Sequence, residues 1–191
     1  MKRTVLALVN MSIDGFTAGP DGDVSWLAEH AAHAEMTAYT RTVWAHATTG
    51  VMGRTNYEGF RHYWPVVAAD PASPPGDRAF ARWFDEVEKV VVSHTLTEAP
   101  WANSRVETDL EKTIHTLRDQ PGGDIVVFNS ASVIRGLMAA GLVDELRLNL
   151  LPEVLGEGLR LFDGPLPRSG WSLAGTTTLP TGAVGLRFVR R

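Results

Sequence analysis

The chain has 191 residues and a mass of 20.8 kDa, and 44% of its residues are hydrophobic, so it can bury a core without disulfides or metals. Its formal net charge of -4 and pI near 5.8 disfavour a broad surface that neutralises phosphates, and we do not expect nucleic acid as its main partner. The absence of cysteine excludes disulfide frameworks, thiolate nucleophiles and cysteine-based zinc sites.

Two features of the sequence bear on location and domain organisation. The first apolar run, residues 5–9, is too short for a signal peptide, and no stretch approaches the roughly 18 apolar residues of a membrane-spanning helix. We therefore expect a soluble, cytoplasmic protein without a membrane partner. No internal repeat or low-complexity linker divides the chain, so residues 1–191 are predicted to form a single domain.

Hydrophobic periodicity predicts the elements of the first half of the chain. In order, we expect a doubly buried strand at 5–9, a turn-rich loop at 14–22, a long helix at 28–44 led by Trp26 and Leu27, a strand at 49–53, a helix at 54–60 and a loop at 65–77.

The second half continues the alternation and closes with a hairpin. In order, we expect a strand at 87–93, a helix opened by a capping box of Thr108 and Glu111 and ending at Leu117, a strand at 125–128, a helix at 130–140 closing on Gly141, a strand within 142–151, and an antiparallel hairpin of 171–178 and 184–189. The fold class is therefore α/β, with a three-layer, mostly parallel twisted sheet flanked by helices and a C-terminal antiparallel hairpin.

In an open parallel sheet, ligands bind beyond the carboxyl ends of the strands, where helix N-termini present free amides to phosphates. Five strand-end segments are polar or contain glycine. They are residues 10–15, 53–55, 93–95, 129–132 and 149–156. Residues 53–55 combine a glycine, an arginine and a hydroxyl, which suits a pyrophosphate but also an ordinary helix cap. Residues 93–95 suit a ribose or its phosphate, or a simple turn.

The candidates for acid–base chemistry are Asp14 and Asp23, which both lie in the loop after the first strand. Asp14 with Gly15 also suits a tight turn, and Asp23 also suits the N-cap of the long helix. His30 and His33 have helical spacing but no zinc-protease pattern, so we predict no metal site.

Six segments, taken in chain order, form a recognisable series. They read Met11-Ser12-Ile13-Asp14-Gly15-Phe16, Trp26-Leu27, Gly53-Arg54-Thr55-Asn56-Tyr57-Glu58, Val92-Ser93-His94-Thr95-Leu96, Gly141-Leu142-Val143-Asp144-Glu145-Leu146 and Leu155-Gly156-Glu157-Gly158-Leu159-Arg160-Leu161-Phe162. Over residues 3 to about 188 the series resembles the dihydrofolate reductase-like superfamily. It is most similar to the C-terminal reductase domain of the bifunctional riboflavin-biosynthesis deaminase/reductase and its stand-alone relatives.

The resemblance implies a reductase that transfers hydride from NADPH to a small heterocyclic substrate, a ribosylaminopyrimidine or a pterin. The residues that it places on the cofactor are Gly53, Arg54, Thr55, Ser93, His94, Thr95, Asn129, Ser130, Ala131, Gly156 and Gly158. It places Asp14 beside the nicotinamide pocket and makes Asp23 a candidate to orient or protonate a substrate nitrogen. We assign substrate contacts to Asn10, Trp26 and Asn149, and the resemblance implies a homodimer that pairs through sheet edges.

Two departures from the family pattern matter. Asn129-Ser130 stands where the family usually has Gly-Gly or Gly-Ser, so a side chain projects toward the expected path of the cofactor, although asparagine tolerates positive φ. The zinc-deaminase signature is absent, so the companion deamination is excluded. A non-catalytic protein that binds a nucleotide or small ligand on the same fold is the alternative function.

Overall fold

The computed structural model describes residues 2–31 and 33–191, and in this part of the chain an eight-stranded sheet has the order β5-β4-β3-β6-β1-β7-β10-β9. Neighbours from β5 to β7 are parallel, and β10 runs antiparallel to both β7 and β9. The bounds are β1 (Val5–Ser12), β3 (Ala47–Gly53), β4 (Glu88–Val92), β5 (Ser104–Glu107), β6 (Asp124–Phe128), β7 (Glu145–Leu151), β9 (Trp171–Thr178) and β10 (Val184–Arg190). The predicted fold class is confirmed.

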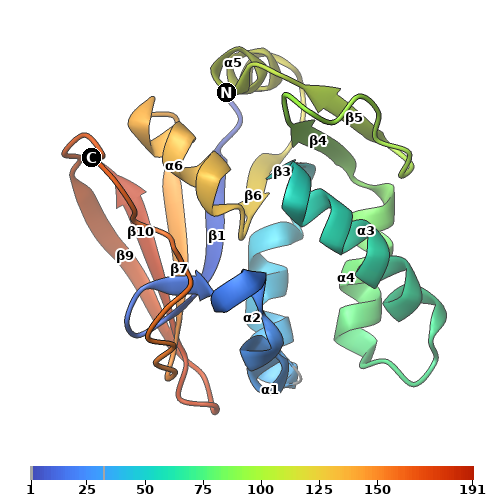
Figure 1. The fold of residues 1–191 in the computed structure, drawn as a ribbon, viewed down its shortest axis with the longest axis vertical. Helices are drawn as coiled ribbons and strands as arrows, with labels where there is room; N and C mark the ends of the chain where they lie inside the picture. Colours follow the sequence, from blue (N-terminus) through green and yellow to red (C-terminus); the bar gives the residue numbers. More distant parts are fainter. Residues whose placement is uncertain (1, 32) are drawn as a thin grey trace.

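Helices cover both faces of the sheet and make three layers (Figure 1). One face carries α5 (Leu110–Asp119) and α6 (Ala131–Ala139), and the other carries α2 (Ala34–Trp44), α3 (Arg54–Ala69) and α4 (Pro75–Glu86). The single turn α1 (Ala28–Ala31) and the 3-10 turns η1 (Pro20–Gly22) and η2 (Ser25–Leu27) lie between β1 and α2 in the chain. Among the described residues, no helix is long and apolar enough to cross a bilayer.

The central strand β1 is buried on both faces, as its continuous apolar run predicts. Its odd-numbered residues, such as Val5, pack with Ile114 and Ile134 of α5 and α6. Its even-numbered residues, such as Leu6, pack in the cluster that holds Phe84 of α4. Because successive side chains of a strand point to opposite faces, this run joins the two halves of the core.

The predicted long helix at 28–44 is wrong in its continuity. The chain forms the short turns η2 and α1 first, His33 has extended backbone angles (φ -78°, ψ 131°), and α2 begins only at Ala34. Residue 32, within that predicted helix, lies outside the described residues.

The predicted loop at 65–77 is also largely wrong, because α3 continues through Pro65 to Ala69 and α4 begins at Pro75. Phe60 and Trp64, one turn apart on α3, pack edge-on against each other, and the ring centroids of Trp64 and of Phe80 on α4 are 4.5 Å apart. This aromatic packing outweighs the backbone hydrogen bond that a proline removes from a helix.

Further differences concern caps and short strands. Asp109, not Thr108, caps α5, because its carboxylate accepts a hydrogen bond from Lys112 N at 3.0 Å. The edge strand β5 and the small antiparallel sheet of β2 (Phe16–Ala18) and β8 (Leu159–Arg160) are absent from the prediction. All three strands are short, with two to four residues, so their alternation of polar and apolar residues cannot be recognised in the sequence.

Candidate functional site

The N-termini of α3 and α6 meet at the carboxyl ends of β3 and β6, which are neighbours in the sheet. Gly53 precedes α3 and Ser130 precedes α6, and Gly53 N donates a hydrogen bond to Ser130 Oγ at 2.9 Å. A Cβ at position 53 would lie 3.2 Å from Ser130 Oγ, so a larger residue would require this hydroxyl to shift by a few tenths of an ångström. Two positive helix ends therefore converge on one place, an arrangement suited to phosphates.

The first turn of α3 adds charge and hydroxyl groups to this place. Arg54 and Thr55 are exposed beside Gly53, free to contact an anion. Asn56, which the functional prediction did not include, donates from Nδ2 to the carbonyl oxygen of Phe128 at 2.8 Å and ties α3 to the end of β6. Ala131, the first residue of α6, is buried beneath the turn.

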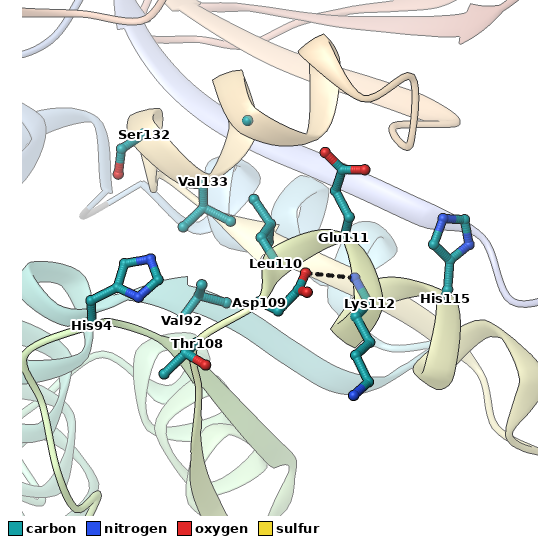
Figure 2. Close-up of a pocket in the computed structure, with 11 residues that line it drawn as sticks. Val92, His94, Thr108, Asp109, Leu110, Glu111, Lys112, His115, Ser132 and Val133 are labelled. Carbon is teal, nitrogen blue, oxygen red and sulfur yellow. Dashed lines mark hydrogen bonds between the residues drawn. The ribbon is translucent and has the colours of Figure 1, made fainter.

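A groove of about 1080 Å³ continues from this junction toward α5. Figure 2 shows His94 from the end of β4 and Ser132 and Val133 from α6 on one side of the view, with His115 of α5 on the other. Since Ser132 and Val133 would also neighbour a Cβ at Gly53, the groove reaches the phosphate-type junction. The lining residues are Val92, His94, Thr108, Asp109, Leu110, Glu111, Lys112, His115, Ser132, Val133 and Gly136.

Residues 93–95 form a local turn at the mouth of the groove. Ser93 is buried, and its Oγ accepts hydrogen bonds from Thr95 N at 3.2 Å and Leu96 N at 3.0 Å. The same turn leaves His94 and Thr95 exposed. The turn interpretation and the binding interpretation are thus compatible, because Ser93 holds the turn while His94 lines the groove.

Asn129 has a positive φ of 45°, a conformation that glycine adopts most easily and that asparagine tolerates. Its Oδ1 accepts a hydrogen bond from Asn10 N at 2.7 Å, so β1 holds the amide. Asn10 Oδ1 in turn accepts from Asn149 Nδ2 at 2.8 Å. Three amides thus link the carboxyl ends of β6, β1 and β7, and they join the predicted cofactor turn to two predicted substrate residues.

Asp14 is held as an acceptor rather than exposed as a free acid. Its carboxylate accepts from Ser12 Oγ at 2.6 Å, from Gly156 N at 2.7 Å and from Leu155 N at 3.2 Å. The hydrogen bond from Ser12, helped by those from the Gly156 and Leu155 amides, lowers the pKa of Asp14 from 3.8 to about 2. At neutral pH the side chain is therefore ionised and fixes the loop after β7 against the end of β1.

Asp23 is exposed, and its carboxylate accepts from both the backbone N and the Oγ of Ser25, at 2.9 and 3.0 Å. These bonds lower its pKa, the backbone bond most strongly. It does not cap the long helix, because that helix begins later; it stabilises the turn before η2. Trp26, in η2, is half-buried against a small cluster made of Met36, Leu151, Leu179 and Ala183.

Gly156 and Gly158 shape the loop that meets β2. Gly156 has φ 78° and donates to Asp14, whereas Gly158 has φ 132° and lies so close to β2 that a Cβ would overlap the carbonyl oxygen of Ala18. Both are therefore required by the backbone path. The structure brings Gly156 together with Asp14, whereas Gly158 lies against Ala18 of β2.

Sequence reasoning missed the α5 wall of the groove, which contributes Asp109, Lys112 and His115. It treated the start of α5 only as a helix cap, and no local signal shows that the turn faces α6. His30, considered only as a metal ligand, is buried with Nε2 at 3.4 Å from Glu153 Oε1. It meets Glu153, 123 residues later in the chain, only in the assembled fold.

Comparisons with known proteins identify the family and the relatives of this chain. The family model described as the RibD C-terminal domain matches residues 3–184. The uncharacterized protein YyaP of Bacillus subtilis (strain 168) is 26% identical over 187 residues, which cover 98% of this chain and 95% of YyaP.

Two solved structures share the fold. A protein ascribed to riboflavin biosynthesis, from Shewanella sp. PV-4, matches with a TM-score of 0.73 and 21% identity over 98% of this chain and 99% of its own. The Thermotoga maritima diaminohydroxyphosphoribosylaminopyrimidine deaminase/5-amino-6-(5-phosphoribosylamino)uracil reductase matches with a TM-score of 0.67 and 11% identity, over 100% of this chain and 57% of its own. The fold is therefore dihydrofolate reductase-like.

Proposed function

The chain belongs to the RibD C-terminal domain family, and on that premise we propose that it is a reductase that transfers hydride from NADPH to a small heterocyclic substrate of the ribosylaminopyrimidine or pterin type. The observation that carries the proposal is the meeting of the α3 and α6 N-termini at Gly53 and Ser130, beside a groove of about 1080 Å³. A groove of this size can hold the adenosine half of a dinucleotide such as NADPH, and the paired helix N-termini favour binding of its phosphates.

The residues at this junction fit the cofactor. Gly53 lets the chain approach a pyrophosphate closely, and Arg54 and Thr55 offer a fixed charge and a hydroxyl. Residues 129–131 border the same junction from α6, and residues 93–95 lie at the groove where the adenosine ribose and its phosphate would bind. Gly156 and Gly158 would shape the wall at the nicotinamide side.

NADPH, when bound, supplies the hydride, and the protein must hold the substrate and allow a proton to reach it. Asn10, Trp26 and Asn149 lie around the ends of β1 and β7, where they would contact the substrate. Asp14, with a pKa of about 2, is ionised and would position the loop at 155–156. Asp23 is exposed in the neighbouring loop and remains our candidate to orient a substrate nitrogen.

Titration of the purified protein with NADPH, and separately with NADH, tests the cofactor. We follow nicotinamide fluorescence and thermal unfolding, and we expect NADPH at 100 times its dissociation constant to stabilise the fold by about 2.7 kcal/mol. Failure of both nucleotides to bind at millimolar concentration would contradict the reductase assignment and favour the non-catalytic binding protein.

A substrate assay separates binding from catalysis. We expect oxidation of NADPH, seen as loss of its absorbance, when 5-amino-6-(5-phosphoribosylamino)uracil or a dihydropterin is added. NADPH binding without oxidation by either compound would restrict the proposal to a different substrate class.

A further inference from the structure

A second cavity lies beside α3 and α4, which pack against each other (Figure 1). It has a volume of about 270 Å³, and its lining residues are Pro65, Ala68, Ala69, Ala81, Asp85 and Trp101. Trp101 packs in the core cluster on the α4 side of the sheet, whereas Val133 of the groove packs in the cluster on the α5 and α6 side. The two cavities therefore lie on opposite faces of the sheet.

Most of the wall of this cavity is apolar. Three of its six lining residues are alanines, and their small side chains leave the space between the helices unfilled. Ala81 is 1% exposed, whereas Ala69 is exposed, so the cavity runs from a buried floor to an open mouth. A concave apolar wall of this kind suits the apolar body of a small molecule.

Trp101, in the segment that joins β4 to β5, provides an aromatic wall that is fixed in place. It is 8% exposed, and its ring packs on that of Phe84 with 5.2 Å between the centroids. Its Nε1 donates to Asp85 Oδ1 at 2.7 Å, and its backbone N donates to Tyr57 Oη at 2.9 Å. Because the indole is held in this way before any ligand arrives, binding does not have to order it.

The charged group of the cavity is the carboxylate of Asp85, which lies in the last turn of α4. Glu86 follows it, and this last turn contains no basic residue. The C-terminal end of a helix carries a partial negative charge, so two carboxylates there are unfavourable unless cations lie nearby. The end of α4 therefore favours the approach of a positive group.

Lys89 is the cation nearest to this helix end, and it leaves the Asp85 carboxylate available. Its Nζ donates to the backbone carbonyl oxygens of residues 84, 85 and 87, which uses its three N–H donors. Among residues 2–31 and 33–191, the hydrogen bond to the Asp85 carboxylate comes from Trp101 and goes to Oδ1. The second oxygen, Oδ2, is thus free to accept from a ligand.

We propose that this cavity binds a small organic ammonium ion with an apolar body, such as an arylalkylamine. The ammonium group donates to Asp85 Oδ2, and the apolar body lies against Trp101 and Pro65. The carboxylate pairs with the charge while the hydrocarbon part leaves water, and both effects favour this class of ligand. The site does not depend on the proposed reductase function, because the cavity shares no lining residue with the cofactor groove.

Three probes of one shape test the charge that the cavity selects. They are 2-phenylethylamine, the neutral 2-phenylethanol and the anionic phenylacetate, each titrated into the purified protein by calorimetry at pH 7. The amine should bind about tenfold more tightly than the alcohol, because its hydrogen bond to the carboxylate is charge-assisted. Phenylacetate should not bind. Equal affinities of amine and alcohol would overturn the proposal, as would an amine that fails to bind at millimolar concentration.

Asp85→Asn tests the residue, because it removes the charge and keeps an oxygen that accepts from Trp101. Amine binding should weaken about tenfold, whereas binding of the alcohol should stay the same. Glu86→Gln is the matched control, since it removes the neighbouring charge outside the lining, and the amine should bind it like the unaltered protein. Equal weakening in both variants would assign binding to general negative charge and overturn the site.

Ala69→Leu tests the cavity itself, because the larger side chain fills the exposed mouth without removing a polar group. Both the amine and the alcohol should lose binding, while thermal unfolding and NADPH binding stay like those of the unaltered protein. Unchanged amine binding in Ala69→Leu, or in Asp85→Asn, would place the amine elsewhere on the molecule and contradict the proposal.

Discussion

At the scale of single residues, the two carboxylates that the sequence nominates for acid–base chemistry are both engaged by nearby donors. Asp14 accepts three hydrogen bonds and Asp23 accepts two. Hydrogen bonds to a carboxylate stabilise its charged form, which is why both pKa values fall. Asp14 therefore suits a loop-fixing role better than proton donation at neutral pH.

This role predicts how Asp14 affects stability. Because its pKa falls from 3.8 to about 2 on folding, its contribution is full above pH 3.8 and is lost as the pH falls through about 2. Asp14→Asn should lower the melting temperature at pH 7, and the difference from the unaltered protein should shrink between pH 4 and 2. Thermal unfolding across this range measures it, with the exposed Asp21→Asn as control. A constant difference throughout would contradict the role.

Gly53 offers a direct test of the cofactor junction. Gly53→Trp places an indole where even an added Cβ would lie 3.2 Å from Ser130 Oγ, so NADPH binding should fall by at least an order of magnitude while the fold persists. Gly59→Trp, on the exposed side of α3 with no atom within 4 Å of its Cβ position, is the matched control. Fluorescence titration and circular dichroism report binding and fold. Equal NADPH affinity in both variants would remove Gly53 from the site.

At the scale of elements, packing decided where α3 and α4 begin and end. Pro65 favours a break in α3, whereas Pro75 suits the first position of α4. Rings on the two helices interlock, and the ring centroids of Phe60 and Phe84 are 5.3 Å apart. The buried side chain of Lys89 then donates hydrogen bonds to the backbone carbonyl groups at the C-terminal end of α4. Lys89 Nζ donates to the carbonyl oxygens of Phe84, Asp85 and Val87 at 2.8, 3.0 and 2.8 Å.

Lys89→Met should destabilise the fold by about 1–3 kcal/mol, because it leaves carbonyl groups unpartnered. Burial lowers the pKa of Lys89 from 10.5 to about 8, against the opposing charge of Asp85. Between these values the unfolded chain holds a proton that the folded protein has released. The free energy of unfolding of the unaltered protein should therefore increase relative to that of Lys89→Met as the pH rises from 8 to 10.5. Urea unfolding measures this, with exposed Lys112→Met as control. A gap that narrows with pH would contradict it.

At the scale of the whole molecule, the sheet ends on β9, which pairs only with β10 among the described residues. Open strand edges with apolar side chains tend to pair with another chain. Leu173 of β9 is 56% exposed. This edge is consistent with the predicted homodimer, which remains a prediction.

We expect the unaltered protein to sediment as a dimer and Leu173→Glu to shift it to a monomer, because charge at a buried edge is unfavourable. Leu159→Glu, at a leucine 46% exposed in the small sheet, should leave the dimer intact. Sedimentation velocity distinguishes these states. A monomeric unaltered protein at micromolar concentration would exclude dimerisation through β9.

Local patterns predicted much of this protein. The doubly buried run at 5–9, the terminal hairpin and the glycine before α3 all followed from periodicity and turn chemistry. The broken helix at 28–44, the helical residues 65–69 and 75–77, and the short strands did not. Their conformations depend on partners distant in the chain, such as the α4 rings for Pro65.

The amino-acid sequence by itself determined the α/β class and the strand ends where Gly53, Asn129 and Asn10 would gather, since apolar spacing and turn residues act over a few positions. Only the tertiary structure decided that the Asp14 carboxylate accepts hydrogen bonds from the backbone amides of residues 155 and 156. It also decided that Trp26 Nε1, His30 Nδ1 and Asn149 Oδ1 are buried without a hydrogen-bond partner in the part of the chain that the structure describes. Hydrogen bonding and burial depend on which groups meet in space, and Asp14 meets the amides of residues 155 and 156 only after β1 and β7 have paired.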